Sequence, residues 1–165
     1  MRKILTLAVS AIFCSTLSAR DDVLYFSLDF LNSPKAKEVL NPNVKLSFGS
    51  GGKGKILKQG LTANKKTNAF NKSDQEACEW AMLSALRTFQ DRAIQEGGSK
   101  VINLTGYYKK QPFDSNQDRA IQEGGSKVIN LTGYYKKQPF DSKTQFQCGA
   151  GALMAGVTLK GDIAK

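Results

Sequence analysis

A perfect internal duplication constrains this chain more than any other feature of its 165 residues. The segment 90–115 reads QDRAIQEGGSKVINLTGYYKKQPFDS, and the segment 117–142 repeats it without a change, with only Asn116 between the copies. Solenoid repeats normally diverge and number three or more, so this pair does not predict a repeat architecture. A recent duplication, an engineered insertion or an assembly error explains it better than a functional tandem module. Removing one copy together with Asn116 restores a self-consistent, smaller chain.

The two copies compete for one place in the expected fold. Copy one continues the longest predicted helix, and copy two runs into the C-terminal strand. We therefore expect copy one to complete that helix, while copy two adds a stub helix at 117–123 and a second strand at 128–135. Two identical strand segments predict ambiguity of register or chain swapping, and more aggregation than in a single-copy form.

The N-terminus has the pattern of a secretory signal peptide. Arg2 and Lys3 follow the initial methionine, residues 4–13 carry no charge, and mostly small residues then lead to Ala19. The alternative is a membrane anchor, but the apolar run is well short of the roughly 20 residues that a span needs. We expect a signal peptide at 1–19, cleavage after Ala19, and a single α+β domain at 20–165 that is periplasmic or secreted.

Export would place the remaining cysteines in an oxidising compartment. Of the three cysteines, Cys14 lies in the signal segment, which leaves Cys78 and Cys148. Two cysteines in such a compartment predict one disulfide, which would close a loop of about 70 residues and stabilise the fold by roughly 4 kcal/mol. Two reduced, buried thiols are the alternative. A redox-active pair is disfavoured because the chain has no C-x-x-C spacing.

The hydrophobic pattern predicts an α+β fold: a small, mainly antiparallel sheet with one long helix on a face, plus the duplicated helix-end and strand unit. A short helix is expected at 33–40. Strands are expected at 23–28, 44–48, 55–63, 101–108 and 146–159.

The long helix is the clearest predicted element. Ser73 and Glu76 form a capping box, S-D-Q-E, at its start. Residues 97–98 are both glycine and end it, because glycine accepts the left-handed cap conformation. Its buried face should carry the residues at helical spacing, which are Cys78, Met82, Ala85, Leu86, Phe89 and Ala93.

The residues with catalytic potential are few. The chain has no histidine, which excludes a Ser-His-Asp or Cys-His pair and a histidine metal ligand. Acidic residues are scattered, with no pair placed for acid/base work. Asn71, Asn103 and Asn130 each begin a glycosylation sequon, which we interpret as coincidence. We predict no catalytic residue, no metal and no cofactor, and favour a non-enzymatic role.

A glycine-rich segment comes close to a phosphate-binding loop. Residues 49–55 read GSGGKGK, against G-x-x-x-x-G-K-[ST], but Ile56 occupies the position that needs a hydroxyl. No good amphipathic helix follows. A glycine-rich hairpin turn is therefore the better interpretation.

Basic residues dominate the charge, with 24 lysines and arginines against 14 acidic residues and a net charge of +10. Lysine doublets adjoin tyrosines in both repeat copies, and lysine beside aromatic rings can bind nucleic acid or anionic polymers. Solvated strand ends are the alternative, which we favour over nucleic acid. A weak attraction to anionic surfaces is expected. The candidate anion-binding residues are Lys65, Lys66, Lys109, Lys110, Lys136 and Lys137.

Three segments carry a resemblance: NKKTNAFNKSDQEACEW at 64–80, GYYKK at 133–137 and QCGAGALMAGVTLKG at 147–161. With the signal peptide, they resemble a family of small exported bacterial proteins of unknown function, often labelled "excinuclease ATPase subunit". The resemblance covers nearly the whole mature chain except one repeat copy. It implies export but no chemistry, and the incomplete phosphate loop does not support the ATPase label.

The chain departs from this family at two points. The second repeat copy is not part of the family pattern. Gly149 follows Cys148 where relatives often have histidine, which weakens any metal role that the resemblance would imply. At fold level the chain is also similar to the small α+β domains of envelope stress-sensor lipoproteins.

Three functional hypotheses follow. The first is an exported, non-enzymatic module that binds a protein or envelope partner or senses envelope state. The second is a cationic binder of nucleic acid or anionic polymer, for which binding should fall linearly with the logarithm of salt concentration. The third and least favoured is an enzyme that uses only carboxylates, lysine or tyrosine. A deep pocket with a strongly shifted carboxylate or lysine would support it.

Overall fold

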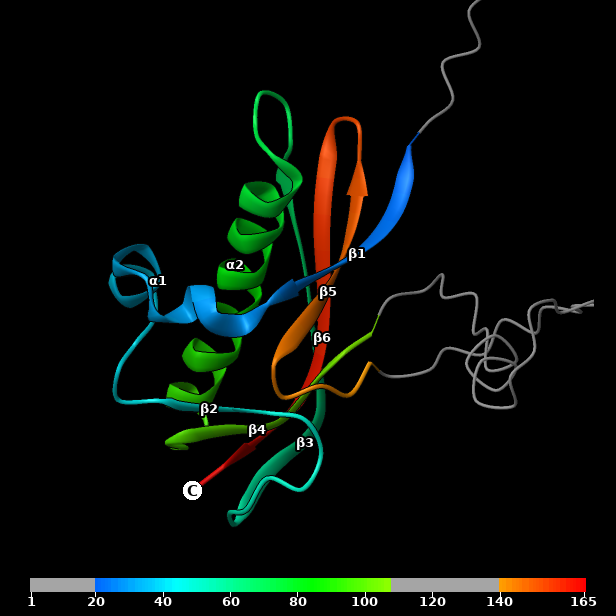
Figure 1. Ribbon diagram of the computed structural model, residues 1–165. Coiled ribbons are helices and arrows are strands. Elements are labelled where there is room, and N and C mark those ends of the chain that lie inside the picture. The colour runs from blue at the N-terminus through cyan, green and yellow to red at the C-terminus, as the bar shows by residue number, and fades with distance from the viewer. Residues whose placement is uncertain (1–19, 108–139) are drawn as a thin grey trace, which may run out of the picture.

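The computed structural model describes residues 20–107 and 140–165, which form two α-helices, one 3₁₀ helix and a six-stranded sheet (Figure 1). The helices are the 3₁₀ helix η1 (Leu28–Asn32), α1 (Pro34–Val39) and α2 (Asp74–Gln95). The strands are β1 (Asp21–Ser27), β2 (Lys45–Phe48), β3 (Ile56–Asn68), β4 (Lys100–Gly106), β5 (Gln145–Gly151) and β6 (Met154–Ala164). This is an α+β fold, as expected.

The sheet is curled and mixed, and β6 is its central strand. β3 pairs with one edge of β6 along the whole strand. The other edge is shared by β5, which pairs beside Ala155 and Gly156, and by β4, which pairs beside the segment from 159 to 164. β1 pairs antiparallel with β5, and β2 pairs in parallel with β4. The sheet therefore forks along β6 and is mainly antiparallel.

Capping residues determine where α2 begins and ends. The Ser73 hydroxyl accepts a hydrogen bond from the Glu76 N–H at 3.1 Å, and Gly97 ends the helix with a φ of +65°. The predicted face of α2 is fully buried, and the helix packs on β6 and β3. The hydrophobic core therefore lies between α2 and one face of the sheet.

A buried glutamine fixes the segment that follows α1. The Gln90 side-chain amide donates to the carbonyl oxygens of Asn41 at 2.8 Å and Val44 at 2.9 Å, and its oxygen accepts from the Asn41 N–H at 2.8 Å. Both the amide and the oxygen of this buried side chain are thus used. The contact ties the chain between α1 and β2 to the long helix.

Cys78 and Cys148 lie at disulfide-bonding distance, with their sulfur atoms 2.01 Å apart, as predicted. The bridge joins α2 to β5 and not to the last strand, because the predicted single strand at 146–159 is wrong. The chain reverses at Ala152 and Leu153, so that β5 and β6 are successive strands. Neither turn residue is a glycine, proline or asparagine, which is why the sequence pattern did not reveal the reversal.

The glycine-rich segment at 49–55 is not a hairpin turn, because β2 and β3 are not partners. It crosses the end of the sheet and contacts β4, where the Gly49 N–H donates to the Leu104 carbonyl oxygen at 2.9 Å. A Cβ atom at Gly52 would lie only 2.7 Å from the Cβ of Ile102. β3, which is longer than the predicted strand at 55–63, follows this segment directly where a phosphate loop would lead into a helix.

The described residues draw on both repeat copies. Copy one supplies the end of α2 and all of β4. It therefore occupies the place in the sheet for which the two copies were expected to compete. Copy two supplies Phe140, whose backbone exchanges hydrogen bonds of 2.8 and 2.7 Å with Gly106. The stub helix expected at 117–123 and the second strand expected at 128–135 lie outside the described residues.

Candidate functional site

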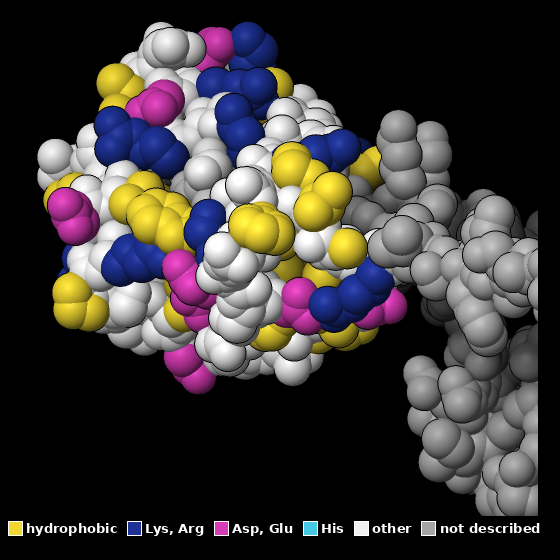
Figure 2. Space-filling model, turned by 90° about the horizontal axis from the view of Figure 1, so that it is seen from above, with side chains coloured by type: hydrophobic (Ala, Val, Ile, Leu, Met, Phe, Trp, Pro, Cys, Tyr) yellow, Lys and Arg dark blue, Asp and Glu magenta, His cyan; other side chains and the backbone are white. Residues whose placement is uncertain are grey.

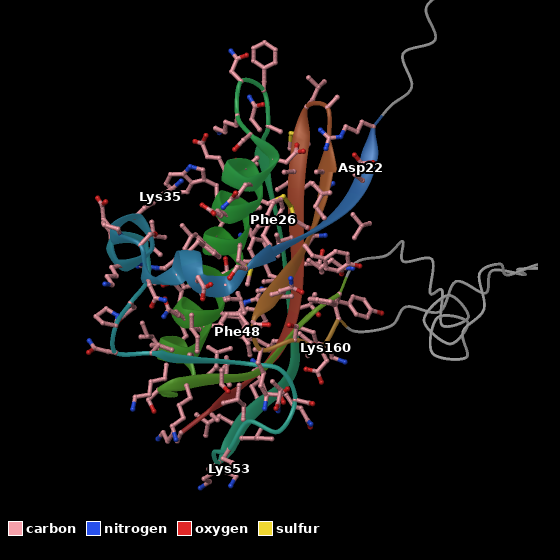
Figure 3. The ribbon with its side chains drawn as sticks, viewed as in Figure 1. Asp22, Phe26, Lys35, Phe48, Lys53 and Lys160 are labelled. Atoms are coloured by element: carbon pink, nitrogen blue, oxygen red, sulfur yellow. A yellow bond between two sulfur atoms is a disulfide. The ribbon has the colours of Figure 1, made fainter. Side chains whose placement is uncertain are left out.

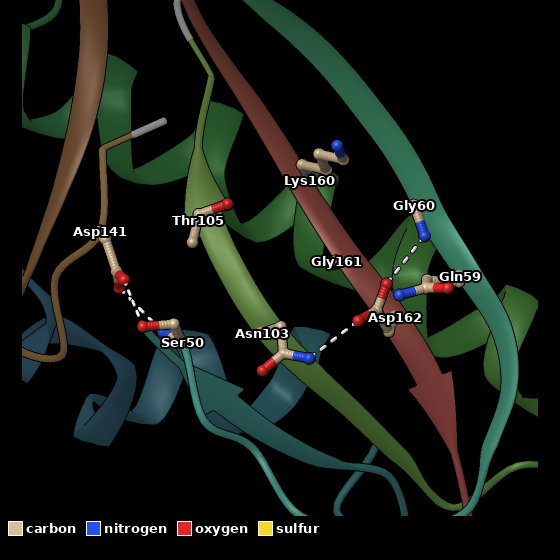
Figure 4. Close-up of a pocket in the computed structure, with 9 residues that line it drawn as sticks. All are labelled: Ser50, Gln59, Gly60, Asn103, Thr105, Asp141, Lys160, Gly161 and Asp162. Atoms are coloured by element: carbon tan, nitrogen blue, oxygen red, sulfur yellow. Dashed lines mark hydrogen bonds between the residues drawn. The ribbon is translucent and has the colours of Figure 1, made fainter. Parts of the chain in front are cut away.

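β6 presents different chemistry to the two faces of the sheet. Val157, Leu159 and Ile163 are buried in the core beside α2. Lys160 and Asp162 alternate with them and lie on the opposite face, with α2 behind the sheet (Figure 4). This open face carries a hollow of about 570 Å³ that is lined by glycine and by residues with polar side chains.

Strand irregularities meet at the hollow. β3 is irregular on both sides of Lys58, up to Leu61, and β4 between Ile102 and Thr105. Gly60 lies in the first of these segments with a φ of +68°, and Asn103 lies in the second with a φ of +55°. Bulges redirect side chains, and a left-handed residue other than glycine is uncommon. At Gly60 and Asn103 the backbone therefore departs from the regular strand ladder, and polar groups lie at the hollow instead.

The Asn103 side chain joins three parts of the chain. Its Oδ1 accepts from the Gly52 N–H at 2.9 Å, and its Nδ2 donates to Asp162 Oδ2 at 2.8 Å. Asparagine tolerates the left-handed conformation better than most residues. The two hydrogen bonds therefore hold the glycine-rich segment, β4 and β6 in one arrangement (Figure 4).

Asp162 is the buried acidic residue of the hollow, with 7% of its surface exposed. Its Oδ1 accepts from the Gly60 N–H at 2.7 Å, and its Oδ2 accepts from Asn103. Burying a carboxylate is costly unless hydrogen bonds compensate, and these two donors supply that compensation. Asp162 thus forms part of a fixed polar floor.

Asp141, which belongs to repeat copy two, lies across the hollow from Asp162 (Figure 4). It accepts hydrogen bonds from the Ser50 hydroxyl at 2.5 Å and from the Ser50 N–H at 2.9 Å. These bonds, helped by Lys143, lower the pKa of the Asp141 carboxyl below its ordinary value. Asp141 therefore stays ionised at neutral pH.

Three other side chains of the hollow are available to a ligand. Within residues 20–107 and 140–165, the polar ends of Gln59, Thr105 and Lys160 have no hydrogen-bond partner. They provide an amide, a hydroxyl and an ammonium group around the floor that Asn103 and Asp162 form. The hollow therefore offers both donors and acceptors for a polar molecule.

The basic residues predicted from the sequence do not form one patch in the described structure. Lys65 and Lys66 are consecutive on β3, pair with Val157 and Gly156, and so point to opposite faces of the sheet. The other candidates, Lys109, Lys110, Lys136 and Lys137, lie outside the described residues.

A different group of lysines lies where β2 and β4 begin and β6 ends. We call this group the lysine end, and it consists of Lys45, Lys53, Lys55, Lys100 and Lys165. Lys45 and Lys100 are register partners, and Lys55 and Lys165 exchange backbone hydrogen bonds of 3.1 and 3.0 Å. Lys53 lies at the same end of the molecule (Figure 3). None of the five side chains has an ion-pair partner among the described residues.

Sequence reasoning missed the residues that build the hollow. Asn103 attracted notice only as the start of a sequon, and Asp141 and Asp162 only as scattered acids. β4 has one extra residue against both β2 and β6, and the local signal for this bulge is weak: a single asparagine within a run of strand-forming residues. The lysine end combines residues from several segments, so no run of basic residues could reveal it.

The described part of the chain contains no group of three or more cysteine, aspartate and glutamate side chains placed to hold a metal ion. No helix within the described ranges is long and apolar enough to cross a membrane. Neither a protein-family profile, a curated protein nor a solved structure matches this chain.

Proposed function

We propose that this protein is an exported, non-enzymatic module that binds a small acidic sugar in the hollow. The observation that carries the proposal is the Asn103–Asp162 pair, a left-handed residue and a buried carboxylate joined by a hydrogen bond of 2.8 Å. Such a pair is costly to build and provides a rigid polar floor. The hollow, which is open to solvent, measures about 570 Å³ and so has room for a small molecule.

The state of the carboxylates favours binding over catalysis. Asp141 has a lowered pKa, so it is a poor proton donor at neutral pH and a weak base toward the Ser50 hydroxyl. Both oxygens of Asp162 accept hydrogen bonds from the protein. The sequence has no histidine to act as a proton shuttle. These residues fit the recognition of a ligand better than its transformation.

The groups around the floor define the ligand. The Lys160 ammonium suits a carboxylate, while Gln59 and Thr105 suit hydroxyl groups. Asp141 adds an acceptor for a further hydroxyl. A sugar acid combines one carboxylate with several hydroxyls and so meets all of these groups.

A titration followed by NMR tests the site. Glucuronic acid should shift the backbone amides of Gly60, Asn103 and Thr105, while glucose should shift them less. Lys160→Gln should remove the preference for the acid, whereas Lys37→Gln on α1 should not. Shifts scattered over the surface, or a preference that survives Lys160→Gln, would contradict the proposal.

Export is the other half of the proposal. It is supported by the signal-like N-terminus, by the paired cysteines and by the resemblance of residues 64–80 and 147–161 to small exported bacterial proteins. Cell fractionation and mass spectrometry should find a processed chain that begins at Arg20. An unprocessed chain in the cytosol would contradict export without bearing on sugar binding.

The lysine end favours a second candidate function, the binding of an anionic polymer. Like charges that lack acidic partners are unfavourable together unless an anion accompanies them. Binding of polyphosphate should weaken linearly with the logarithm of salt concentration. Replacing Lys53 and Lys55 by glutamine should reduce that slope by about 1 to 2, while the same change at Lys65 and Lys66 should have little effect. Equal losses from both pairs would contradict a localised site.

A further inference from the structure

We propose that the outer edge of β3 between residues 63 and 67, which we call the β3 edge, binds an extended acidic peptide segment that joins the sheet as a further strand. This site is separate from the hollow and does not rest on sugar binding. β3 pairs with β6 on one side, and no strand among the described residues pairs with its other side. Unpaired N–H and C=O groups along a strand are a template for a further strand.

The hydrogen bonds around β3 show which of its backbone groups face outward. The Ala69 N–H donates to the Leu153 carbonyl oxygen at 2.9 Å, so residue 69 faces β6. The register with β6 is unbroken from 61 to 68, and successive residues of an antiparallel strand turn their backbone groups to opposite sides. Asn64 and Lys66 therefore direct their N–H and C=O groups away from β6. No partner for these four groups lies within the described residues.

Side chains close the β3 edge at both ends. Arg92 Nη1 donates to the Thr62 carbonyl oxygen at 2.8 Å, and Lys72 Nζ donates to the Asn68 carbonyl oxygen at 3.1 Å. Both carbonyl groups face outward, in agreement with the alternation. Toward the start of β3 the register is interrupted, and such irregularities discourage strand pairing. The open length is therefore that of one short strand.

The alternation of donors and acceptors on the β3 edge selects a peptide. An incoming strand supplies both N–H and C=O groups at the matching spacing. A phosphate polymer carries mainly acceptors, so it would leave the outward carbonyl oxygens of Asn64 and Lys66 unsatisfied. The ligand class is therefore an extended peptide and not the anionic polymer considered for the lysine end.

The charges beside the β3 edge select an acidic peptide. Lys65 is half-buried on the face where Ala63 packs toward α2, and Lys66 is exposed on the opposite face. Arg92 lies at one end of the edge. None of these three basic side chains has an ion-pair partner among the described residues. An added strand would thus meet a basic group on each of its faces, which suits carboxylates and opposes a basic strand.

The acidic side chains of α2 do not cancel this charge. Glu76 and Glu79 lie, by helical spacing, on the side of α2 that carries Gln90. Gln90 contacts the segment between α1 and β2, so these two acids are directed away from β3. The remaining acids of α2 and its C-cap are held in ion pairs, which are Glu96–Lys58, Asp91–Arg87 and Asp74–Arg20.

A second copy of the same edge is a poor occupant. Two β3 edges in contact would bring Lys65, Lys66 and Arg92 of both chains together, and like charges on neighbouring strands are destabilising. Lysine on a free edge is a common means of preventing such self-pairing. Figure 2 looks onto the end where β3 leads into α2 and shows basic side chains gathered on one side of the molecule. The same charge that opposes a second copy attracts an acidic strand.

An NMR titration with a short synthetic peptide of alternating glutamate and threonine tests this proposal. The backbone amides of Asn64 and Lys66 should shift, and their hydrogen exchange should slow, because these N–H groups gain acceptors. The amides of Asn103 and Thr105 at the hollow should not shift. Failure of sugar binding would therefore be seen separately from failure of peptide binding.

Two altered peptides separate strand addition from charge attraction alone. The same peptide methylated at every backbone nitrogen keeps its carboxylates but cannot donate to the edge. It should bind at least about tenfold more weakly. A peptide with lysine in place of glutamate keeps the backbone donors and should also bind more weakly, because it meets like charges on both faces.

Matched pairs of substitutions locate the charge effect. Lys65→Gln with Lys66→Gln should lower the affinity for the acidic peptide roughly threefold to tenfold, because two cross-strand charge pairs are lost. Lys45→Gln with Lys100→Gln removes the same net charge from two register partners at the lysine end. That control should change the affinity less than about twofold.

Three results would overturn the proposal. The first is equal binding of the methylated and unmethylated peptides, which would leave charge attraction alone. The second is an equal loss of affinity from the two pairs of lysine substitutions. The third is protection of the Asn64 and Lys66 amides without peptide in a self-associated form, which would make a second copy the occupant.

Discussion

The two faces of β6 differ in how they are held together. Beside α2 the strand carries apolar residues and Gly161, where a Cβ would lie 3.0 Å from Leu104 Cδ2 and 3.4 Å from Phe89 Cε1. On the open face the same strand carries Lys160 and Asp162, which lie in the hollow. Burial orders the first face, and directed hydrogen bonds order the second. Substitutions on the two faces should therefore differ in size and in what they change.

The largest effect is expected on the face toward α2. Phe89 is fully buried, so Phe89→Ala should lower the free energy of unfolding by about 3–5 kcal/mol through lost burial and the cavity left behind. Urea denaturation measures the change. Ser84→Ala, on the exposed side of the same helix, should change stability by no more than about 0.5 kcal/mol. Similar losses at both positions would mean that the core is not where the burial places it.

The disulfide on the same face should rank second. Replacing Cys78 and Cys148 by alanine should cost about 2–4 kcal/mol, because the unfolded chain regains the freedom of a long loop. Denaturation in oxidising and reducing buffers measures this cost, and the NMR signals of the hollow should stay in place. Free Cys78 and Cys148 thiols in protein purified without a reducing agent would contradict the bridge.

Two substitutions of Asn103 can separate the contribution of its side-chain hydrogen bonds from that of its left-handed backbone conformation. Asn103→Ala should cost about 1–3 kcal/mol, since Asp162 loses a donor and alanine fits the left-handed conformation poorly. Asn103→Gly also removes the amide but accepts that conformation. It should recover part of the loss, about 1 kcal/mol. Equal stability of the two variants would show that backbone conformation is unimportant here.

The face toward α2 is the part that the sequence pattern predicts well. A capping serine, a helical spacing of apolar residues and two glycines define α2, because each acts on neighbours within a few residues. The Cys78–Cys148 pair was predicted from the cysteine count and the expected compartment alone. Local chemistry and simple counting were sufficient for both.

The open face is the part that the pattern does not predict. The turn at Ala152 and Leu153 contains no turn-forming residue, so two strands looked like one. Asn103 lies in a bulge of β4 that interrupts its pairing with both β2 and β6, two strands that are distant from it in sequence. The lysine end likewise depends on the order of strands. Bulges, turns and clusters of this kind arise from tertiary contacts, which a single sequence does not display.

The duplication offers a change that should act near the open face alone. Because the copies are identical, removing any one repeat length within 90–142 gives the same chain, and deleting 109–135 retains every described residue. The connection from Gly106 to Phe140, now formed by 107–139, would shrink to 107–108 joined to 136–139. The shorter loop should stabilise the fold by about 1–2 kcal/mol. Thermal melting measures the gain, and a shorter chain that fails to fold would show that the duplicate has become structural.

The smallest effect is expected from the Asp141 carboxyl, which is exposed. Its folded-state pKa lies below the unfolded value, so its contribution to stability is present above the unfolded pKa near 3.8 and is lost as the pH falls through the folded pKa. Ser50→Ala removes the hydroxyl donor and should raise the Asp141 pKa toward its ordinary value. Carbon-13 NMR of the carboxyl measures both midpoints, and Ser84→Ala is the control. If Ser50→Ala left the midpoint unchanged, the Ser50 hydroxyl would not order this edge of the hollow, and packing rather than directed hydrogen bonds would set its geometry.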